Sequence, residues 1–275
     1  MTCGHFMTKE PTIFLTNDDG IHSPGLRAAV HAVMHLGNVV VIAPVDQQTG
    51  KGRGFSGNMD APLEPVKYTI DEQEIQAFHY EGSPAMVVHH GLNVLFSQQP
   101  PDLLISGINY GENLGTNITI SGTIGAALEG ASRGIPSIAI SLQTEKGAYY
   151  HYSDRDWNVA AHFLARFARP LLHHALPFDV DVLKIDVPHA ATLQTPWRLT
   201  RLSRQPYYTS YLEAPSLEST PRDATFQIHI NESSLEKESD IYALAIDQVV
   251  SVTPLSLNCT SRADFQAIHK TLRAS

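Results

Sequence analysis

Short runs of consecutive apolar residues recur through the first two thirds of the chain and alternate with segments of helical periodicity. The runs are rich in Val, Ile and Leu, which is typical of strands buried on both faces. We expect strands at residues 13–16, 38–43, 103–105, 137–141 and 182–187. Between them, the spacing of apolar positions predicts helices at 26–36, 83–96, 121–133 and 157–167.

This alternation predicts an α/β fold: a three-layer, Rossmann-like arrangement with a mostly parallel sheet and helices on both faces. We expect it to occupy residues 12–190, with a polar, β-like insertion at 62–80. Segments 197–202, 226–230 and 241–245 alternate apolar and polar positions, which predicts a β-rich C-terminal arm over residues 191–250. Residues 251–275 should complete the fold with a strand and an amphipathic helix at 262–272.

Composition narrows the class of protein. The 275 residues are 43% hydrophobic and 17% charged, as in ordinary globular proteins. A net charge of −9 argues against a broad nucleic-acid surface, so we expect no stable nucleic-acid complex. Apolar runs are too short for a membrane span, and the first eleven residues resemble a short disordered extension rather than a secretory signal. Cys3 and Cys259 provide no disulfide framework, so we expect a cytoplasmic protein.

The most informative polar motif is Asn17-Asp18-Asp19-Gly20, directly after the first predicted strand. Two neighbouring carboxylates at the end of a buried strand would keep a proton unless a cation balances their charge. Oxygen ligands favour a hard ion such as Mg²⁺, Mn²⁺ or Ca²⁺ over Zn²⁺. The competing interpretation of this segment alone is a solvated turn, because the same residues are good turn formers.

Polar loops also follow the strands at 38–43 and 103–105. The first loop includes Thr49, and the second includes Asn109 and Asn113. Ligands of an open parallel sheet gather beyond the carboxyl ends of its strands. We therefore expect Asp18, Asp19, a hydroxyl near residue 49 and an amide at 109 or 113 to share one rim.

A helix beginning at Ser121-Gly122-Thr123 would point its free N–H groups and its positive dipole end at that rim. Such a helix terminus suits a phosphate group. The sequence therefore indicates a metal-assisted site for a phosphorylated ligand.

Other motifs are weaker. The segment Gly52-Arg53-Gly54-Phe55-Ser56-Gly57 formally matches the dinucleotide fingerprint, but it lies too far from its strand and leads into no helix. Gly50-Lys51 lacks the remainder of a P-loop. His31 and His35 share a helix face without the glutamate of a zinc-protease helix. The chain contains no Gly-x-Ser-x-Gly elbow, which argues against a serine hydrolase.

At the residues of the predicted site, the chain resembles the SurE family, stationary-phase survival proteins that act as metal-dependent nucleoside monophosphate phosphatases. The most specific matching segments are Leu15–Gly25, with its Asn-Asp-Asp-Gly motif, and Ile105–Gly115, with its Ser-Gly-Ile-Asn motif. Shorter matches cover Val41–Pro44, Gly82–Ala85, Ser121–Thr123 and Val250–Leu255. The resemblance extends over about residues 12–257, with the segments in the expected order.

The resemblance implies hydrolysis of nucleoside monophosphates at the 5′ position, with the 3′ position also open, by a water molecule positioned beside one divalent ion per subunit. Mg²⁺ or Mn²⁺ is expected, and Ca²⁺ can occupy such a site. The implied metal ligands are Asp18, Asp19, Thr49 and Asn109, where Thr49 replaces the family's usual serine.

Asp18 and Asp19 are the implied catalytic residues, and an Asp19 oxygen would accept the proton of the water. The residues expected to bind phosphate are Asn17, Asn113, Ser121, Gly122 and Thr123. Met86 stands where many members have an acidic residue, which leaves the base or sugar preference open. The family's C-terminal arm is usually exchanged between subunits, which implies a homodimer or homotetramer. Residues 251–275 either complete the fold or are exchanged in the same way.

Two alternatives remain at this stage. One is a binding module with an acidic pair, like a receiver domain, although such domains are shorter and lack the Ser-Gly-Ile-Asn loop. The other is a SurE relative that has lost catalysis, for which the Thr49 replacement is the relevant difference.

Overall fold

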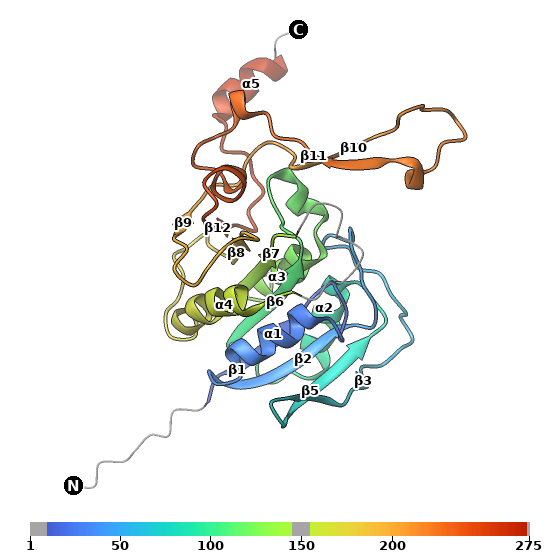
Figure 1. Ribbon diagram of the computed structural model, residues 1–275, viewed down its shortest axis with the longest axis vertical. Helices are drawn as coiled ribbons and strands as arrows, with labels where there is room; N and C mark the ends of the chain where they lie inside the picture. Colours follow the sequence, from blue (N-terminus) through green and yellow to red (C-terminus); the bar gives the residue numbers. More distant parts are fainter. Residues whose placement is uncertain (1–9, 145–154, 274–275) are drawn as a thin grey trace, which may run out of the picture.

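The computed structural model describes residues 10–144 and 155–273, so most of the expected N-terminal extension lies outside the described residues. Its centre is a mixed sheet with strand order β3-β5-β2-β1-β6-β7-β8-β12-β9 (Figure 1). Six central strands run parallel to one another: β5 (Gln73–Tyr80), β2 (Asn38–Pro44), β1 (Thr12–Thr16), β6 (Leu103–Tyr110), β7 (Ser137–Leu142) and β8 (Val182–Val187).

Short strands extend both edges of this parallel centre. On one side, β3 (Glu64–Pro65) and β4 (Tyr68–Ile70) pair antiparallel with β5. On the other, β12 (Val250–Leu255) pairs antiparallel with β8, and β9 (Trp197–Leu199) runs parallel to β12. The strand predicted at 197–202 is therefore shorter than expected and belongs to the main sheet.

Helices cover both faces of the sheet. α1 (Pro24–Val33) and α4 (Asn158–Leu171) pack together on one face, and α2 (Pro84–Val94) and α3 (Gly122–Ala131) pack together on the other (Figure 1). The sequence sets where α1 and α2 begin, because each has an N-cap serine followed by proline. The Oγ atoms of Ser23 and Ser83 accept hydrogen bonds from backbone N–H groups three residues later.

Two large apolar cores separate the three layers. One lies under α1 and α4 and includes Leu15, Val30 and Phe163. The other lies under α2 and includes Phe14 and Val88. Leu15 and Phe14 are neighbours on β1 and face opposite sides of the sheet, as expected for a strand buried on both faces. This confirms the predicted three-layer α/β fold.

The chain order creates a switch point beside β1. From β1 the chain moves outward to β2 and β5, then crosses back to β6 on the other side of β1. The connections that leave β1 and β6 therefore diverge, which opens a crevice at the carboxyl ends of these strands. The acid pair follows β1 directly, so the fold places it at the crevice.

Strand β6 is longer than predicted. It continues to Tyr110, with a register shift against β7 between Ser106 and Asn109. Gly107 lies within the shift at φ +128°, and a Cβ atom there would be 2.3 Å from the carbonyl oxygen of Ile140. Only glycine tolerates both the positive φ and the close carbonyl oxygen. The glycine that the register shift requires interrupts the apolar run in the sequence, so the predicted strand was shorter than the real one.

The C-terminal region differs most from prediction. A hairpin of β10 (Tyr208–Tyr211) and β11 (Thr225–Ile228) projects from the body (Figure 1). β11 overlaps the strand expected at 226–230, whereas β10 was not predicted. The strand predicted at 241–245 is wrong, because η4 (Tyr242–Ile246) is a π-helical turn. Ser239 Oγ accepts a hydrogen bond from Tyr242 N at its start, and Ile241 and Leu244 both enter a small apolar core.

The remaining elements are short. Helical turns occur at η1 (Thr116–Ile120), η2 (Pro221–Asp223) and η3 (Glu232–Ser234). The predicted C-terminal helix is present as α5 (Phe265–Arg273). Within the described residues, every helix is too short or too polar to span a bilayer.

Candidate functional site

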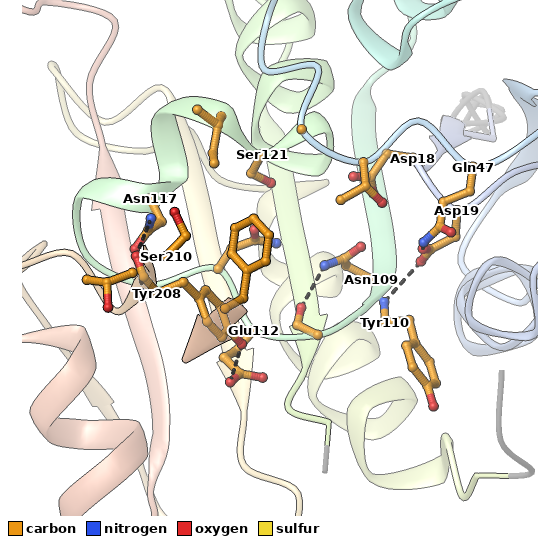
Figure 2. Close-up of a pocket in the computed structure, with 17 residues that line it drawn as sticks. Asp18, Asp19, Gln47, Asn109, Tyr110, Glu112, Asn117, Ser121, Tyr208 and Ser210 are labelled. Carbon is orange, nitrogen blue, oxygen red and sulfur yellow. Dashed lines mark hydrogen bonds between the residues drawn. The ribbon is translucent and has the colours of Figure 1, made fainter. Parts of the chain in front are cut away.

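The two aspartates after β1 are both buried, each with 6% exposure. Asp18 Oδ1 accepts a hydrogen bond of 2.6 Å from Thr123 Oγ1, in the first turn of α3. Asp19 Oδ2 accepts one of 3.0 Å from Tyr110 N at the end of β6, and its Oδ1 accepts one of 3.3 Å from Gln47 Nε2 (Figure 2). The pair therefore connects a helix start to the ends of three strands.

Burial makes this pair costly to ionise. Burial raises the pKa of Asp18 above its ordinary value, against the lowering effect of the hydrogen bonds from Thr123. Burial, together with the charge of Asp18, raises the pKa of Asp19 to about 7. A nearby cation would relieve both the lost hydration and the mutual repulsion.

The neighbouring donor atoms suit a hard divalent cation. Thr49 and Asn109 line the same cavity as the two aspartates. Asn109 Nδ2 donates a 2.6 Å hydrogen bond to Gly111 O, so Oδ1 is the side-chain atom with which Asn109 could bind a cation. The described residues contain no cluster of three or more His, Cys, Asp and Glu side chains suited to a metal. A site here would therefore combine two carboxylates with neutral oxygens, which fits Mg²⁺, Mn²⁺ or Ca²⁺.

The cavity itself has a volume of about 460 Å³. The structure brings six of the residues predicted for the site to its wall: Asp18, Asp19, Thr49, Asn109, Asn113 and Ser121. Ser121 is the N-cap of α3, and its Oγ accepts a hydrogen bond from Ile124 N. In Figure 2 the two aspartates and Asn109 lie on one side of the cavity, whereas Tyr208, Ser210 and Asn117 lie on the other.

Three of the predicted residues do not line the cavity: Asn17, Gly122 and Thr123. Asn17 Nδ2 donates to Gly20 O and Ser23 Oγ, at 3.1 and 2.7 Å, and so shapes the turn into α1. The hydroxyl of Thr123 donates its hydrogen bond to Asp18 Oδ1. A Cβ atom at Gly122 would lie 2.8 Å from Asp18 Oδ2, so glycine permits the close approach of α3. These three residues therefore shape the backbone around the aspartates and the start of α3, and do not contact a ligand in the cavity directly.

The loop that carries Thr49 is fixed by ion pairs outside the cavity. Arg53 Nη2 lies 2.9 Å from Oε2 of Glu129, a buried residue of α3, and His89 Nδ1 lies 3.2 Å from the other oxygen of Glu129. Ser83 Oγ donates to Gly54 O. The glycine-rich segment 52–57 thus contacts α3 at Glu129 and the start of α2 at Ser83, and it does not follow its strand as a dinucleotide-binding turn would.

A buried charge cluster that the sequence did not reveal holds the loop after β6. Lys184 and Asp186, both on β8 and fully buried, form an ion pair, and Lys184 Nζ lies 3.1 Å from Asp240 Oδ2. Lys184 also donates to Asn113 O at 2.8 Å, while Asp186 Oδ1 accepts from Asn113 N at 2.8 Å. Both backbone groups of Asn113 are therefore held by the cluster.

Electrostatics keep this cluster charged. Burial alone would lower the pKa of Lys184, but the charges of Asp186 and Asp240 raise it above its ordinary value. The only sequence signal was a lysine and an aspartate within an apolar strand run at 182–187. Such residues are almost never fully buried without a partner, which is the clue that could have identified them.

Comparisons with known proteins agree with this geometry. The family model described as survival protein SurE matches residues 13–209. The chain is 38% identical to the 5′-nucleotidase SurE of Thermococcus gammatolerans, over 94% of this chain and 95% of that protein. It is 39% identical to the 5′-nucleotidase SurE of Thermococcus kodakarensis, over 95% and 98% of the two chains.

Comparison with a solved structure also shows similarity to a SurE protein. The crystal structure of SurE protein from Aquifex aeolicus superposes with a TM-score of 0.71 at 30% sequence identity, covering 95% of this chain and 100% of that one. The range matched by the family model, residues 13–209, includes both strand ends that carry the acid pair and Asn109. On its fold, its site motifs and these similarities, the chain belongs to the SurE family.

Proposed function

We propose that this chain is a divalent-metal-dependent nucleotidase that hydrolyses nucleoside monophosphates, with 5′ esters as substrates and 3′ esters as further candidates. One observation carries the proposal: two buried carboxylates, a hydroxyl and an amide meet at the switch point of the sheet, in front of a helix start. The names of the relatives, 5′-nucleotidase SurE, support the same activity.

The proposed ligands of the cation are Asp18, Asp19, Thr49 and Asn109. A bound Mg²⁺ or Mn²⁺ supplies positive charge that offsets the negative charge of a phosphoryl group. Thr123 holds Asp18 through its 2.6 Å hydrogen bond, and Tyr110 N holds Asp19. These bonds fix the carboxylates before substrate arrives, which keeps the reorganisation during reaction small.

The other roles follow from position. We assign Asp19 as the group that takes a proton from the attacking water, since its hydrogen-bond donors lie at 3.0 and 3.3 Å, farther than the 2.6 Å donor that holds Asp18. Asn113 and Ser121 also line the cavity and would donate hydrogen bonds to phosphate oxygens as their charge redistributes. Asn17, Gly122 and Thr123 would act on phosphate only through the turn and the helix start that they shape.

The proposal extends to assembly. α5 exposes a row of large apolar side chains, including Phe265 at 67% and Leu272 at 81%. Exposed apolar surface of this kind is unfavourable in water and is typical of contact surfaces. We assign residues 191–250 as the arm that joins copies of this chain into a homodimer or homotetramer. Within residues 251–275, β12 completes the sheet and α5 is the part exposed for such a contact.

Phosphate release from 5′- and 3′-mononucleotides tests the activity, first with EDTA and then with Mg²⁺, Mn²⁺ or Ca²⁺ restored. We expect release to stop with EDTA and return with metal. Asp18→Asn and Asp19→Asn should each lower turnover by several orders of magnitude. Asp46→Asn is the matched control, because Asp46 is an exposed carboxylate on the loop after β2 that does not line the cavity.

Two results would contradict this proposal. One is a folded protein that releases no phosphate with any of the metals, which would leave a binding module. The other is near-normal activity in Asp18→Asn or Asp19→Asn, which would place the reaction elsewhere. Calorimetric measurement of Mn²⁺ binding shows, for each variant, whether activity is lost because the metal no longer binds or because turnover has stopped.

A further inference from the structure

The cavity, at about 460 Å³, is larger than a phosphate group requires, and the hairpin builds the side away from the aspartates. Tyr208 and Ser210 on β10 line it, opposite the two aspartates (Figure 2). Phe226 on β11 also lines the cavity. Ser210 and Phe226 are paired across the hairpin. The part of a substrate that extends away from the phosphate must therefore meet these side chains.

This side of the cavity exposes apolar surface. Phe226 is 66% exposed, and Ile120, at the end of η1, is 57% exposed. Both line the cavity. Large apolar side chains that face a water-filled cavity offer surface that a ligand can cover favourably. A flat aromatic group would cover a phenylalanine ring with the greatest contact area.

The wall beside Phe226 is held in place. Asn117 Oδ1 accepts hydrogen bonds of 2.7 and 2.9 Å from the backbone N–H groups of Tyr207 and Tyr208, and its Nδ2 donates to Tyr208 O. The ring of buried Tyr207 packs edge-on against that of Tyr208, with centroids 4.8 Å apart. The hairpin is thus fixed at its base to η1, so the ring of Tyr208 is positioned before a ligand binds.

The chemistry of this side favours a neutral ligand. Among the described residues that line it, the charged one is Glu112, which is buried. One of its oxygens accepts a 2.6 Å hydrogen bond from Tyr208 Oη, and the other accepts from Thr144 N. Each oxygen of Glu112 therefore already has a partner within the protein. Ser210 and Thr209 remain as neutral polar groups.

We infer that the hairpin side of the cavity is the binding site for the nucleobase, with Phe226 as the ring on which the base stacks and Tyr208 as the rigid wall beside it. This inference rests on the proposed function, because the phosphate must lie at the aspartates for the base to reach the hairpin. It assigns the role of recognising the nucleoside to the arm, and the role of hydrolysis to the core.

Two substrates separate these roles: adenosine 5′-monophosphate, which has a base, and ribose 5-phosphate, which does not. Stacking of a base on an aromatic side chain corresponds to roughly 5- to 100-fold in affinity. We expect Phe226→Ala to raise KM for the nucleotide by about that factor, with little change in kcat. KM for ribose 5-phosphate should stay the same, and Phe226→Trp should retain the nucleotide KM.

Tyr211→Ala is the matched control, because Tyr211 lies on the same hairpin, is 43% exposed and does not line the cavity. It should change neither KM. Size-exclusion chromatography of both alanine variants checks that the assembly is unchanged. Adenosine, which has no phosphate, should inhibit the wild-type protein competitively and inhibit Phe226→Ala more weakly.

The outcomes distinguish this inference from the proposed function. If the wild-type protein hydrolyses neither substrate, the nucleotidase proposal fails, and calorimetry with adenosine still shows whether the base site exists. If the wild-type protein is active but Phe226→Ala changes neither KM, or raises both equally, the base site is not at the hairpin. An effect of Tyr211→Ala equal to that of Phe226→Ala would also overturn it.

Discussion

Lys184 on β8 and Asp240, in the segment before η4, form a 3.1 Å ion pair with both side chains fully buried. Asp240 also accepts hydrogen bonds from Gly115 N and Ser203 N, at 3.0 and 2.9 Å. The pair therefore joins the sheet, the loop after β6 and the C-terminal region. Since the same loop carries Asn113, this contact couples the wall of the catalytic cavity to the arm.

Lys184→Met should destabilise the protein by about 3–5 kcal/mol, because it leaves Asp186 and Asp240 buried without a cation. Denaturant unfolding measures the difference in the free energy of unfolding. The double variant Lys184→Met/Asp240→Asn leaves one unpaired carboxylate and should recover part of the loss. The control is Arg201→Met, which breaks the exposed 3.1 Å pair with Glu238 and should cost about 0–1 kcal/mol. Equal losses in Lys184→Met and Arg201→Met would argue against a role for burial.

The same variant should have an altered pH dependence. Burial raises the pKa of Asp186 from its ordinary value of 3.8 even with Lys184 present, and removing the lysine should raise it further. The folded state then binds a proton that the unfolded chain releases, so this carboxyl favours folding at low pH and loses that contribution as the pH rises. The stability deficit of Lys184→Met relative to wild type should be smaller at pH 5 than at pH 8. A deficit that does not change with pH would contradict this assignment.

Thr123→Val should lower kcat/KM by about 10- to 100-fold, because it removes the hydroxyl that holds Asp18 while keeping the shape of the side chain. Thr123→Ser keeps the hydroxyl and should retain most of the activity. Steady-state kinetics at saturating Mn²⁺, with a Mn²⁺ titration of each variant, separate a change in metal binding from a change in turnover. If Thr123→Val kept full activity, the bond to Asp18 would have no catalytic consequence.

Thr49→Val tests whether the hydroxyl at this position binds the metal. It should weaken Mn²⁺ binding measured by calorimetry, whereas Thr49→Ser, which has the residue usual in the family, should bind Mn²⁺ as wild type does. Thr49 is exposed, so neither change should alter the free energy of unfolding of the metal-free protein by more than about 0.5 kcal/mol. Unchanged Mn²⁺ affinity in Thr49→Val would remove Thr49 from the set of ligands.

Local pattern predicted the core of this protein well because its elements are regular. Val39 to Ile42 form an uninterrupted β-branched run, and they became β2. Serine followed by proline marks the starts of α1 and α2 at Ser23 and Ser83. The prediction from the apolar–polar pattern was wrong where tertiary packing decided the conformation. Residues 241–245 alternate like a strand, but Ser239 caps a helical turn there and Leu244 joins a core with Tyr207.

For the site, the sequence by itself determined the chemistry: two adjacent carboxylates after a buried strand, a hydroxyl, two amides and a helix start, in an order that resembles one family. The fold decided which of these residues reach the cavity. Asn109 does so from within β6, past the register shift at Gly107, whereas Thr123 is turned toward Asp18. The partners of Lys184 and the hairpin wall at Phe226 come from distant segments of the chain. Only tertiary contacts bring such segments together, because local periodicity records which face of an element is buried and not what packs against it.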